Sequence, residues 1–326
     1  MYLLTLNFWK KSLIFMLLCC FGSVSKSFAI HDFINSFRKP AVLGLKSSAA
    51  EVLPKEIRSP FKFIGGLMYV VVQVNGVEGL LLVDTGSNGF ILLNSDHFKT
   101  EKTDQQLKGM TSEVSIERVA INSLTWQNLK LEKQYLPAVK LSQLNQGSSE
   151  KILGLIGSAF FKSYQLNFNF ASREMVLSKE GIEEPKLKGI APTISIPFAL
   201  LNNFPVVEVR ISNQPYRFIM DTGATDNIMD LSLEVSAGKE WQQTQEVQMV
   251  EGSGNTGKVR RGKLRNMWIG GLNMQGIGMG LHAMPAFDEQ MQVSGILGFQ
   301  FLKYFYVQIN YIENTMKFYD MAMLLK

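Results

Sequence analysis

An internal repeat constrains the fold more than any other feature of this 326-residue chain. Residues 68–86 align without a gap with residues 205–223, and both segments end in Asp-Thr-Gly. In the first copy Val70, Val72 and Val74 alternate with other residues, and apolar residues recur at the matching positions of the second. This alternation predicts a strand with one buried face. A turn and a continuous apolar run follow, which predicts a second strand buried on both faces. The chain is therefore expected to contain two copies of one strand-rich unit.

The end of each copy repeats as well. Gly154-Leu-Ile-Gly157 matches Gly295-Ile-Leu-Gly298, and an apolar segment ending in Asn and an aromatic residue follows each block. Helical periodicity is weak, and short helices are expected only around 158–162 and 299–304. Each copy is thus a unit of about 120 to 130 residues, which suits a domain.

These boundaries divide the chain into five segments. Residues 179–192 have the composition of a linker, which separates a first unit over 61–178 from a second over 193–326. Residues 1–29 form a leader. Residues 30–60 are polar and proline-punctuated, and three interpretations stay open for them: an arm that pairs with the body, a short inhibitory pro-segment, or a flexible tail.

The leader has the layout of a secretory signal peptide. Lys10 and Lys11 precede an apolar run over 13–21, and the segment ends Ser27-Phe28-Ala29. The apolar run is short for a membrane span, so contact with a membrane is expected only if the leader stays uncleaved as an anchor. The chain is therefore expected to be exported, to the periplasm of a bacterium or to its medium.

Composition after the leader excludes several classes of function. Both cysteines lie in the leader, so no disulfide is expected. Residues 1–29 hold three lysines and no acid, and removing them lowers the formal net charge from +5 to +2. This near neutrality gives no reason to expect a nucleic-acid partner. The three histidines are scattered, so neither a metal site nor a cofactor is predicted.

The two Asp-Thr-Gly segments suit hydrolysis by a pair of carboxyl groups. One ionised carboxyl acts as base on a water, while its protonated partner polarises the carbonyl of the substrate. A buried strand delivers each of Asp84 and Asp221 to a dry interior, and the glycine two residues later lets a second loop approach closely. One Asp-Thr-Gly alone is weak evidence, because a strand ending in a turn explains it. Two copies in the same context predict a catalytic pair with one aspartate from each half.

The chain resembles the pepsin and retropepsin superfamily of aspartic peptidases, in particular bacterial two-domain members. The resemblance covers about 260 residues, from Phe61 to the C-terminus. It is carried by Leu82-Val-Asp-Thr-Gly-Ser87, Ile219-Met-Asp-Thr-Gly-Ala224 and the paired blocks Leu155-Ile-Gly157 and Ile296-Leu-Gly298. It implies an all-β, bilobal fold, with two duplicated barrel-like lobes of six to seven strands around a central cleft.

The resemblance also assigns roles to the residues of the two loops. It implies that Asp84 and Asp221 bind the attacking water and that Thr85 and Thr222 cross-link their loops. Ser87 would donate a hydrogen bond to the outer oxygen of Asp84, which its counterpart cannot do. The loop-support residues expected on this basis are Thr85, Gly86, Ser87, Thr222, Gly223 and Ala224.

Flaps and a basic hairpin are less well defined by sequence. A flap tyrosine has no clear match, and the expected flap tips are Gly109, Met110, Gly252, Ser253 and Gly254. Residues 252–258 also approach a phosphate-binding loop, but Val259 follows the lysine where Ser or Thr is needed. The basic residues that follow are interpreted as a solvated hairpin, with attraction of phosphate or of an acidic peptide as the alternative. They are Lys258, Arg260, Arg261, Lys263 and Arg265.

The sequence thus predicts an aspartic endopeptidase that uses a water nucleophile, without metal or covalent intermediate. Its partner is a peptide or protein substrate, no nucleotide is expected to bind, and the protein is expected to be a monomer. The alternative is a catalytically silent module of the same fold that holds peptides or proteins without cutting them. A nucleotide-binding enzyme built on residues 252–258 is the third hypothesis.

Overall fold

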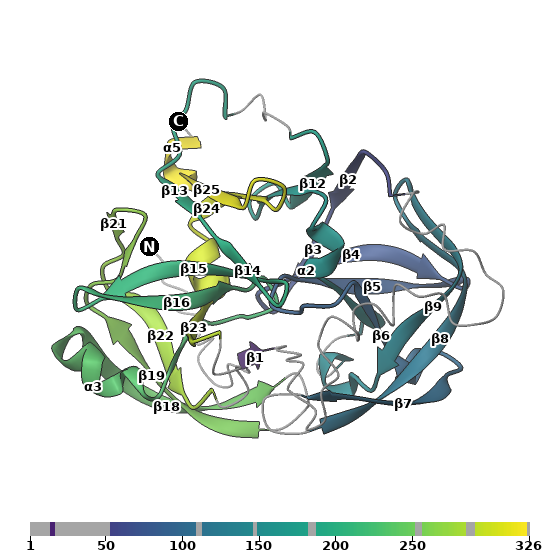
Figure 1. The fold of residues 1–326 in the computed structure, drawn as a ribbon, viewed down its shortest axis with the longest axis horizontal. Helices are drawn as coiled ribbons and strands as arrows, with labels where there is room; N and C mark the ends of the chain where they lie inside the picture. Colours follow the sequence, from purple (N-terminus) through teal and green to yellow (C-terminus); the bar gives the residue numbers. More distant parts are fainter. Residues whose placement is uncertain are drawn as a thin grey trace, which may run out of the picture.

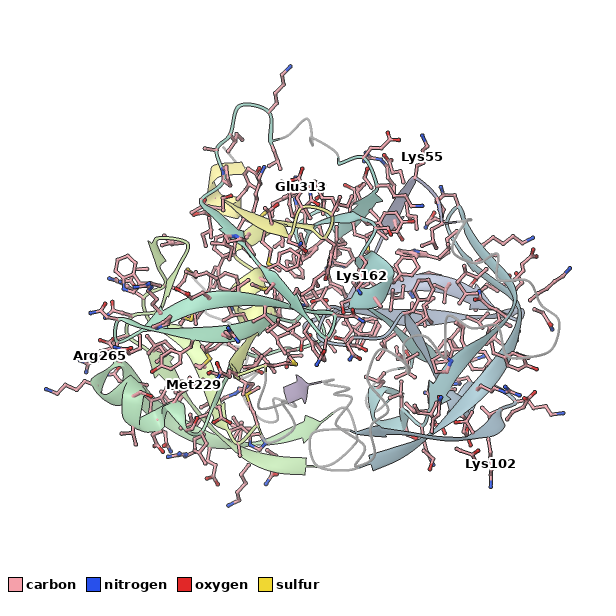
Figure 2. All side chains as sticks on the ribbon, viewed as in Figure 1. Lys55, Lys102, Lys162, Met229, Arg265 and Glu313 are labelled. Carbon is pink, nitrogen blue, oxygen red and sulfur yellow. The ribbon has the colours of Figure 1, made fainter. Side chains whose placement is uncertain are left out.

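The computed structural model describes residues 14–16, 53–108, 113–145, 149–181, 187–251, 256–284 and 291–324. Within these residues three sheets make up the molecule, one in each half of the chain and one shared by both. Figure 1 shows the two halves side by side with the shared sheet above them. Long charged side chains such as Lys55 and Lys102 project from the periphery (Figure 2).

The first lobe is built on an eight-stranded sheet in the order β3-β4-β5-β10-β6-β9-β8-β7. Its strands are β3 (Lys62–Ile64), β4 (Leu67–Val74), β5 (Val77–Asp84), β6 (Ile91–Asn94), β7 (Glu101–Lys108), β8 (Glu113–Trp126), β9 (Leu129–Val139) and β10 (Ile152–Gly157). The 3-10 helices η2 (Ser95–His97) and η3 (Ser142–Asn145) lie in its loops.

The second lobe is built on an eleven-stranded sheet. Its strands are β14 (Ala199–Leu201), β15 (Phe204–Ile211), β16 (Gln214–Met220), β17 (Ile228–Asp230), β18 (Trp241–Glu251), β19 (Thr256–Leu264), β20 (Trp268–Ile269), β21 (Leu272–Asn273), β22 (Ile277–His282), β23 (Val293–Leu297) and the short β1 (Ile14–Met16). Helix α3 (Leu233–Ala237) and the 3-10 helix η5 (Gly238–Glu240) precede β18. Strand β1 pairs in parallel with the end of β18. It falls within the predicted leader, whose export and cleavage stay predictions.

The same strand arrangement recurs in both lobes. In the first, β10 lies between β5, which it pairs with in parallel, and β6, which it pairs with antiparallel. In the second, β23 lies between β16 and β17 in the same two senses. Each central strand belongs to a repeated Gly-apolar-apolar-Gly block and is followed by a short helix, α2 (Ser158–Phe161) or α4 (Phe299–Leu302). The expected short helices are confirmed.

A six-stranded sheet joins the lobes in the order β13-β25-β24-β11-β12-β2. Its strands are β2 (Glu56–Pro60), β11 (Gln165–Asn169), β12 (Glu174–Ser178), β13 (Ile194–Pro197), β24 (Phe305–Asn310) and β25 (Thr315–Asp320), and α5 (Met321–Leu324) follows. Because β11 of one half pairs with β24 of the other, this sheet fixes the lobes to each other. Residues 56–60 pair with β12 as an edge strand, so this part of the 30–60 segment is joined to the body.

The all-β, bilobal fold class is therefore confirmed, with more strands in each half than the six to seven that the resemblance implied. The difference comes from long hairpins and short added strands around the repeated units. A main apolar core runs through both lobes and includes Val83 and Met220, the residues that immediately precede the two aspartates.

Candidate active site

Asp84 and Asp221 lie at equivalent strand ends, and both are fully buried. Asp84 ends β5, and Asp221 directly follows β16, where its N–H donates to the carbonyl of Leu297 at 2.9 Å. Side chains alternate between the two faces of a strand. Each aspartate therefore points to the same side as the residue two positions before it, away from the main core.

Two threonines cross-link the loops that carry these aspartates. The Thr85 hydroxyl donates to the carbonyl of Met220 at 2.7 Å, and the Thr222 hydroxyl donates to the carbonyl of Val83 at 2.7 Å. The N–H groups of the same threonines donate to each other's hydroxyl oxygens at 3.1 and 3.0 Å. All four bonds are buried and join residues about half the chain apart, so they hold the loops in one relative position.

Each carboxyl group lies over the glycine of the opposite loop. A Cβ atom on Gly86 would overlap the carboxyl group of Asp221, and one on Gly223 would overlap that of Asp84. Neither glycine has a positive φ, so space rather than backbone conformation requires glycine here. The arrangement brings the two aspartates together across the lobe boundary.

Burial and proximity shift the protonation of the two carboxyl groups. Burial raises the pKa of Asp84 well above its usual range, and the charge of Asp221 raises it further, while backbone N–H groups of Gly86 and Ser87 act in the opposite sense. Burial also raises the pKa of Asp221, to about 6, against the lowering effect of the Gly223 N–H. That N–H donates to Asp221 Oδ1 at 2.7 Å. Two carboxyl groups this close cannot both ionise easily, so they hold a proton in common.

Within the described residues, three oxygens of the pair have no hydrogen-bond partner of ordinary geometry, although the Gly86 and Ser87 N–H groups lie near enough to lower the pKa of Asp84: Oδ1 and Oδ2 of Asp84 and Oδ2 of Asp221. The prediction that the Ser87 hydroxyl donates a hydrogen bond to Asp84 is therefore wrong. Ser87 is buried, and its carbonyl accepts from the Ser158 hydroxyl at 2.9 Å, which fixes its backbone instead. Ala224 occupies the matching position in the second lobe and is also buried. Buried unpartnered oxygens are suited to a small polar ligand.

Each aspartate faces a separate apolar cluster. The first Asp-side cluster comprises Leu67, Tyr69, Leu80, Leu82, Leu92, Ile116, Val139, Leu141, Leu144, Ile152 and Leu155. The second Asp-side cluster comprises Phe204, Val206, Ile219, Ala224, Ile228, Val259, Met284, Met291 and Ile296. Leu82 and Ile219, which share a strand face with the aspartates, belong to these clusters. The carboxyl pair thus lies between two apolar walls, one from each lobe.

Two tyrosines that the sequence did not single out lie near the pair. Tyr69 pairs with Leu82 across β4 and β5 and is the diagonal neighbour of Asp84. Burial and the charge of Asp84 raise its pKa. Tyr311 is buried behind the loops with its hydroxyl unpartnered, and burial together with both aspartates raises its pKa. Both phenols therefore stay neutral. The sequence could have indicated Tyr69, because strand alternation places it on the same side of its strand as the aspartate.

Each lobe carries a long hairpin, β7–β8 in the first lobe and β18–β19 in the second. Figure 1 shows them extending toward each other along one side of the molecule. The predicted flap tips Gly109, Met110, Gly252, Ser253 and Gly254 lie outside the described residues.

The basic residues of β19 do not form one solvated run. Lys258 is exposed and pairs with Glu246 at 3.0 Å. Arg260 makes a two-pronged bond with Glu234, and Arg261 donates to Asp226 at 2.7 Å in a largely buried pair. Strand alternation could have predicted this difference, because Arg261 lies two residues after the buried Val259 and therefore on the same face of the strand.

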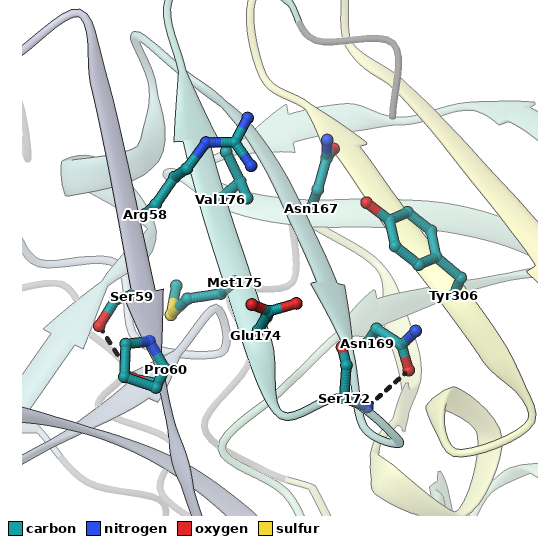
Figure 3. A pocket seen from close by; sticks show the side chains of 10 residues that line it. All are labelled: Arg58, Ser59, Pro60, Asn167, Asn169, Ser172, Glu174, Met175, Val176 and Tyr306. Carbon is teal, nitrogen blue, oxygen red and sulfur yellow. Dashed lines mark hydrogen bonds between the residues drawn. The ribbon is translucent and has the colours of Figure 1, made fainter. Parts of the chain in front are cut away.

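A pocket of about 140 Å³ lies elsewhere, on the six-stranded sheet. Figure 3 shows Arg58, Asn167, Glu174 and Tyr306 among its lining residues. Neither aspartate lines it. The candidate site is therefore defined by the geometry of the carboxyl groups and not by this pocket. Within the described residues, no group of three His, Cys, Asp or Glu is arranged to hold a metal ion. None of the helices in the same residues is long and apolar enough to span a bilayer.

Comparisons with known proteins agree with this geometry. A family model described as aspartyl protease matches residues 207–301, which include Asp221 and its following block. The crystal structure of an aspartic proteinase from Irpex lacteus shares the fold, with a TM-score of 0.53 and 13% sequence identity over 82% of this chain and 98% of that one. No curated protein matches the sequence.

The duplicated β lobes and the paired aspartates are those of an aspartic peptidase fold. Residues 207–301 thus match an aspartyl protease family model, and the chain shares the fold of an aspartic proteinase.

Proposed function

We propose that this protein is an aspartic endopeptidase in which Asp84 and Asp221 activate a water molecule between the lobes. The reciprocal packing of each carboxyl group over the other loop's glycine carries the proposal, because it brings two buried acids into contact. The cross-linking threonines support it, since four buried hydrogen bonds preorganise the pair before substrate arrives.

A hydrogen bond to Asp221 suggests how the proton is shared. The Gly223 N–H donates to Asp221 Oδ1 at 2.7 Å, which favours the ionised form of Asp221, so we assign Asp221 as the base and Asp84 as the holder of the shared proton. Asp221 takes a proton from water as its oxygen bonds to the carbonyl carbon, and Asp84 gives its proton to the carbonyl oxygen. Asp221 then protonates the leaving amine as the C–N bond breaks, and the second hydroxyl of the hydrated carbonyl returns a proton to Asp84. The pair ends in its starting state.

An extended substrate has a place to lie in this arrangement. The Asp-side clusters offer apolar walls on both sides of the carboxyl pair. Strand β1 shows that β18 of the second-lobe hairpin accepts an extended segment along its edge. Main-chain pairing of this kind is a common way to hold a peptide.

The test is cleavage of a random peptide library by the purified protein. We expect Asp84→Asn and Asp221→Asn each to lower kcat/KM by about 100-fold to 10,000-fold, the range for loss of an acid or base. Asp96→Asn is the matched control, because Asp96 is an exposed aspartate that accepts from Ser142 in an unrelated loop. A transition-state mimic of the hydrated peptide should inhibit the wild type.

Unchanged cleavage by the folded Asp221→Asn protein would contradict the proposal. Peptide binding without cleavage by the wild type would favour the silent-module alternative.

A further inference from the structure

The second lobe carries a charged pair on the same side as its aspartate. Asp226 follows Asp221 by five residues, and Arg261 of β19 donates from Nη2 to its Oδ2 at 2.7 Å. The side chain of Arg261 is only 19% exposed and that of Asp226 only 15%. Arg261 Nε is buried and has no hydrogen-bond partner among the residues that the structure describes. A buried donor without an acceptor is costly, and such groups are satisfied where a ligand supplies the acceptor.

Strand alternation fixes the direction of Arg261. Val259 belongs to the second Asp-side cluster, so Arg261, two residues later, points to that side of β19. Arg260 lies between them and points to the opposite side, where Nη1 and Nη2 bond both oxygens of Glu234 at 2.6 and 2.7 Å. Two adjacent arginines thus serve different faces of one hairpin, and only Arg261 lies on the face of Asp221.

The charges around Asp226 favour a negatively charged ligand group as the acceptor for the Arg261 Nε–H. Arg261 and Lys303 both lower the pKa of Asp226, against the raising effect of its burial. One carboxylate therefore faces two cations. In the first lobe, Gly89 occupies the position that matches Asp226, and the cluster there is apolar apart from the Tyr69 hydroxyl.

We propose that Arg261 is a specificity-determining residue, which receives a carboxylate-bearing side chain of the substrate on the second-lobe side of the scissile bond. The first Asp-side cluster receives an apolar side chain on the other side. Asp226 holds the guanidinium in place, and the Nε–H is the donor that the substrate satisfies. This inference rests on the proposed peptidase function and adds a substrate class to it.

The experiment uses fluorogenic peptides in which Glu, Gln or Leu is placed at each of three positions on either side of the cleaved bond. At one position the wild type should cleave the Glu peptide about tenfold better than the Leu peptide, as expected for a buried charged hydrogen bond. Arg261→Met should remove this preference, so that the ratio of kcat/KM for the Glu peptide to that for the Leu peptide falls to about one. Arg260→Met is the matched control and should keep the preference.

Arg261→Lys, which keeps the charge but not the Nε–H, should retain part of the preference and also serves if Arg261→Met does not fold. An equal loss on all peptides, or an unchanged Glu-to-Leu ratio in both Arg261 variants, would overturn the inference while leaving the peptidase intact. Absence of cleavage by the wild type would instead contradict the proposed function. In that case calorimetric binding of the Glu and Leu peptides to wild type and Arg261→Met still decides the role of Arg261.

Discussion

Five residues after its aspartate, the first lobe has Gly89 and the second has Asp226. At the position that precedes each aspartate by fifteen residues, the first lobe has Tyr69 and the second has Val206. The Asp-Thr-Gly residues themselves are identical and make reciprocal bonds. The comparison teaches that the lobes share what a carboxyl pair needs and differ in what surrounds it. The following predictions test whether the shared part is equivalent and the unshared part is dispensable for chemistry.

The largest effect is expected at the glycines beneath the carboxyl groups. Gly86→Ala and Gly223→Ala should each lower kcat/KM by about 100-fold or more, because the added methyl displaces the opposite carboxyl group. Gly89→Ala is the control, since a Cβ there meets no atom within 4 Å. Similar losses in all three folded variants would contradict the steric explanation, and a loss in only one of Gly86→Ala and Gly223→Ala would break the proposed equivalence of the two loops.

Both aspartates should make the stability of the protein depend on pH. Each aspartate has a raised pKa in the folded protein. Its favourable contribution to the free energy of unfolding is therefore fully present below the ordinary pKa of 3.8, and it is lost as the pH rises through the pKa of the folded state. For Asp221, with a folded pKa of about 6, the cost at pH 7 is on the order of 3 kcal/mol. Asp221→Asn should therefore unfold at higher temperature than wild type at pH 7 and at a similar one near pH 4.

Asp84→Asn should likewise unfold at higher temperature than wild type at pH 7, because burial and the charge of Asp221 raise the pKa of Asp84. Thermal unfolding at several pH values checks both variants. A wild type that is more stable than both variants at pH 7 would contradict the assignment.

The cross-linking threonines should be equivalent. Thr85→Val and Thr222→Val each remove a hydroxyl that both donates and accepts, so each should lower the free energy of unfolding by about 1 to 3 kcal/mol. The Thr→Ser variants keep the hydroxyl and should lose less. Urea unfolding measures the free energy of unfolding of the four variants. A clear difference between the Thr85 and Thr222 variants would contradict the equivalence of the two threonines.

The smallest effect is expected at Ser87. Ser87→Ala gives the first lobe the residue that the second has at Ala224, and the structure shows no bond from this hydroxyl to Asp84. We expect kcat/KM to change by less than about threefold. A loss of about 30-fold or more would restore the role for Ser87 that the family resemblance implied.

The sequence predicted the parts of this molecule that depend on local pattern and repetition. Alternating valines predicted the strands, and the repeated Gly-apolar-apolar-Gly block predicted the two short helices and an equivalent setting for each aspartate. The cross-link by Thr85 and Thr222 also followed, but from the family resemblance rather than from the residues alone.

Long-range contacts explain what the sequence did not predict. The burial of Arg261 depends on Asp226, which lies 35 residues away in another loop. The sequence of a charged run does not show whether the run faces solvent or a folded loop. The sequence analysis therefore predicted the β19 arginines to be solvated like the exposed Lys258. The pairing of residues 56–60 likewise depends on β12, over 100 residues later, and no local pattern encodes such a partner.

The central claim is that one carboxyl group from each lobe shares a proton in a buried pair. Carbon NMR of protein labelled at the aspartate carboxyl carbons measures this directly across pH 3 to 9. The account predicts two coupled titration steps, both above the ordinary aspartate pKa of 3.8, that disappear or change together in Asp84→Asn. Two independent titrations near 3.8, each unaffected by loss of the other aspartate, would contradict it.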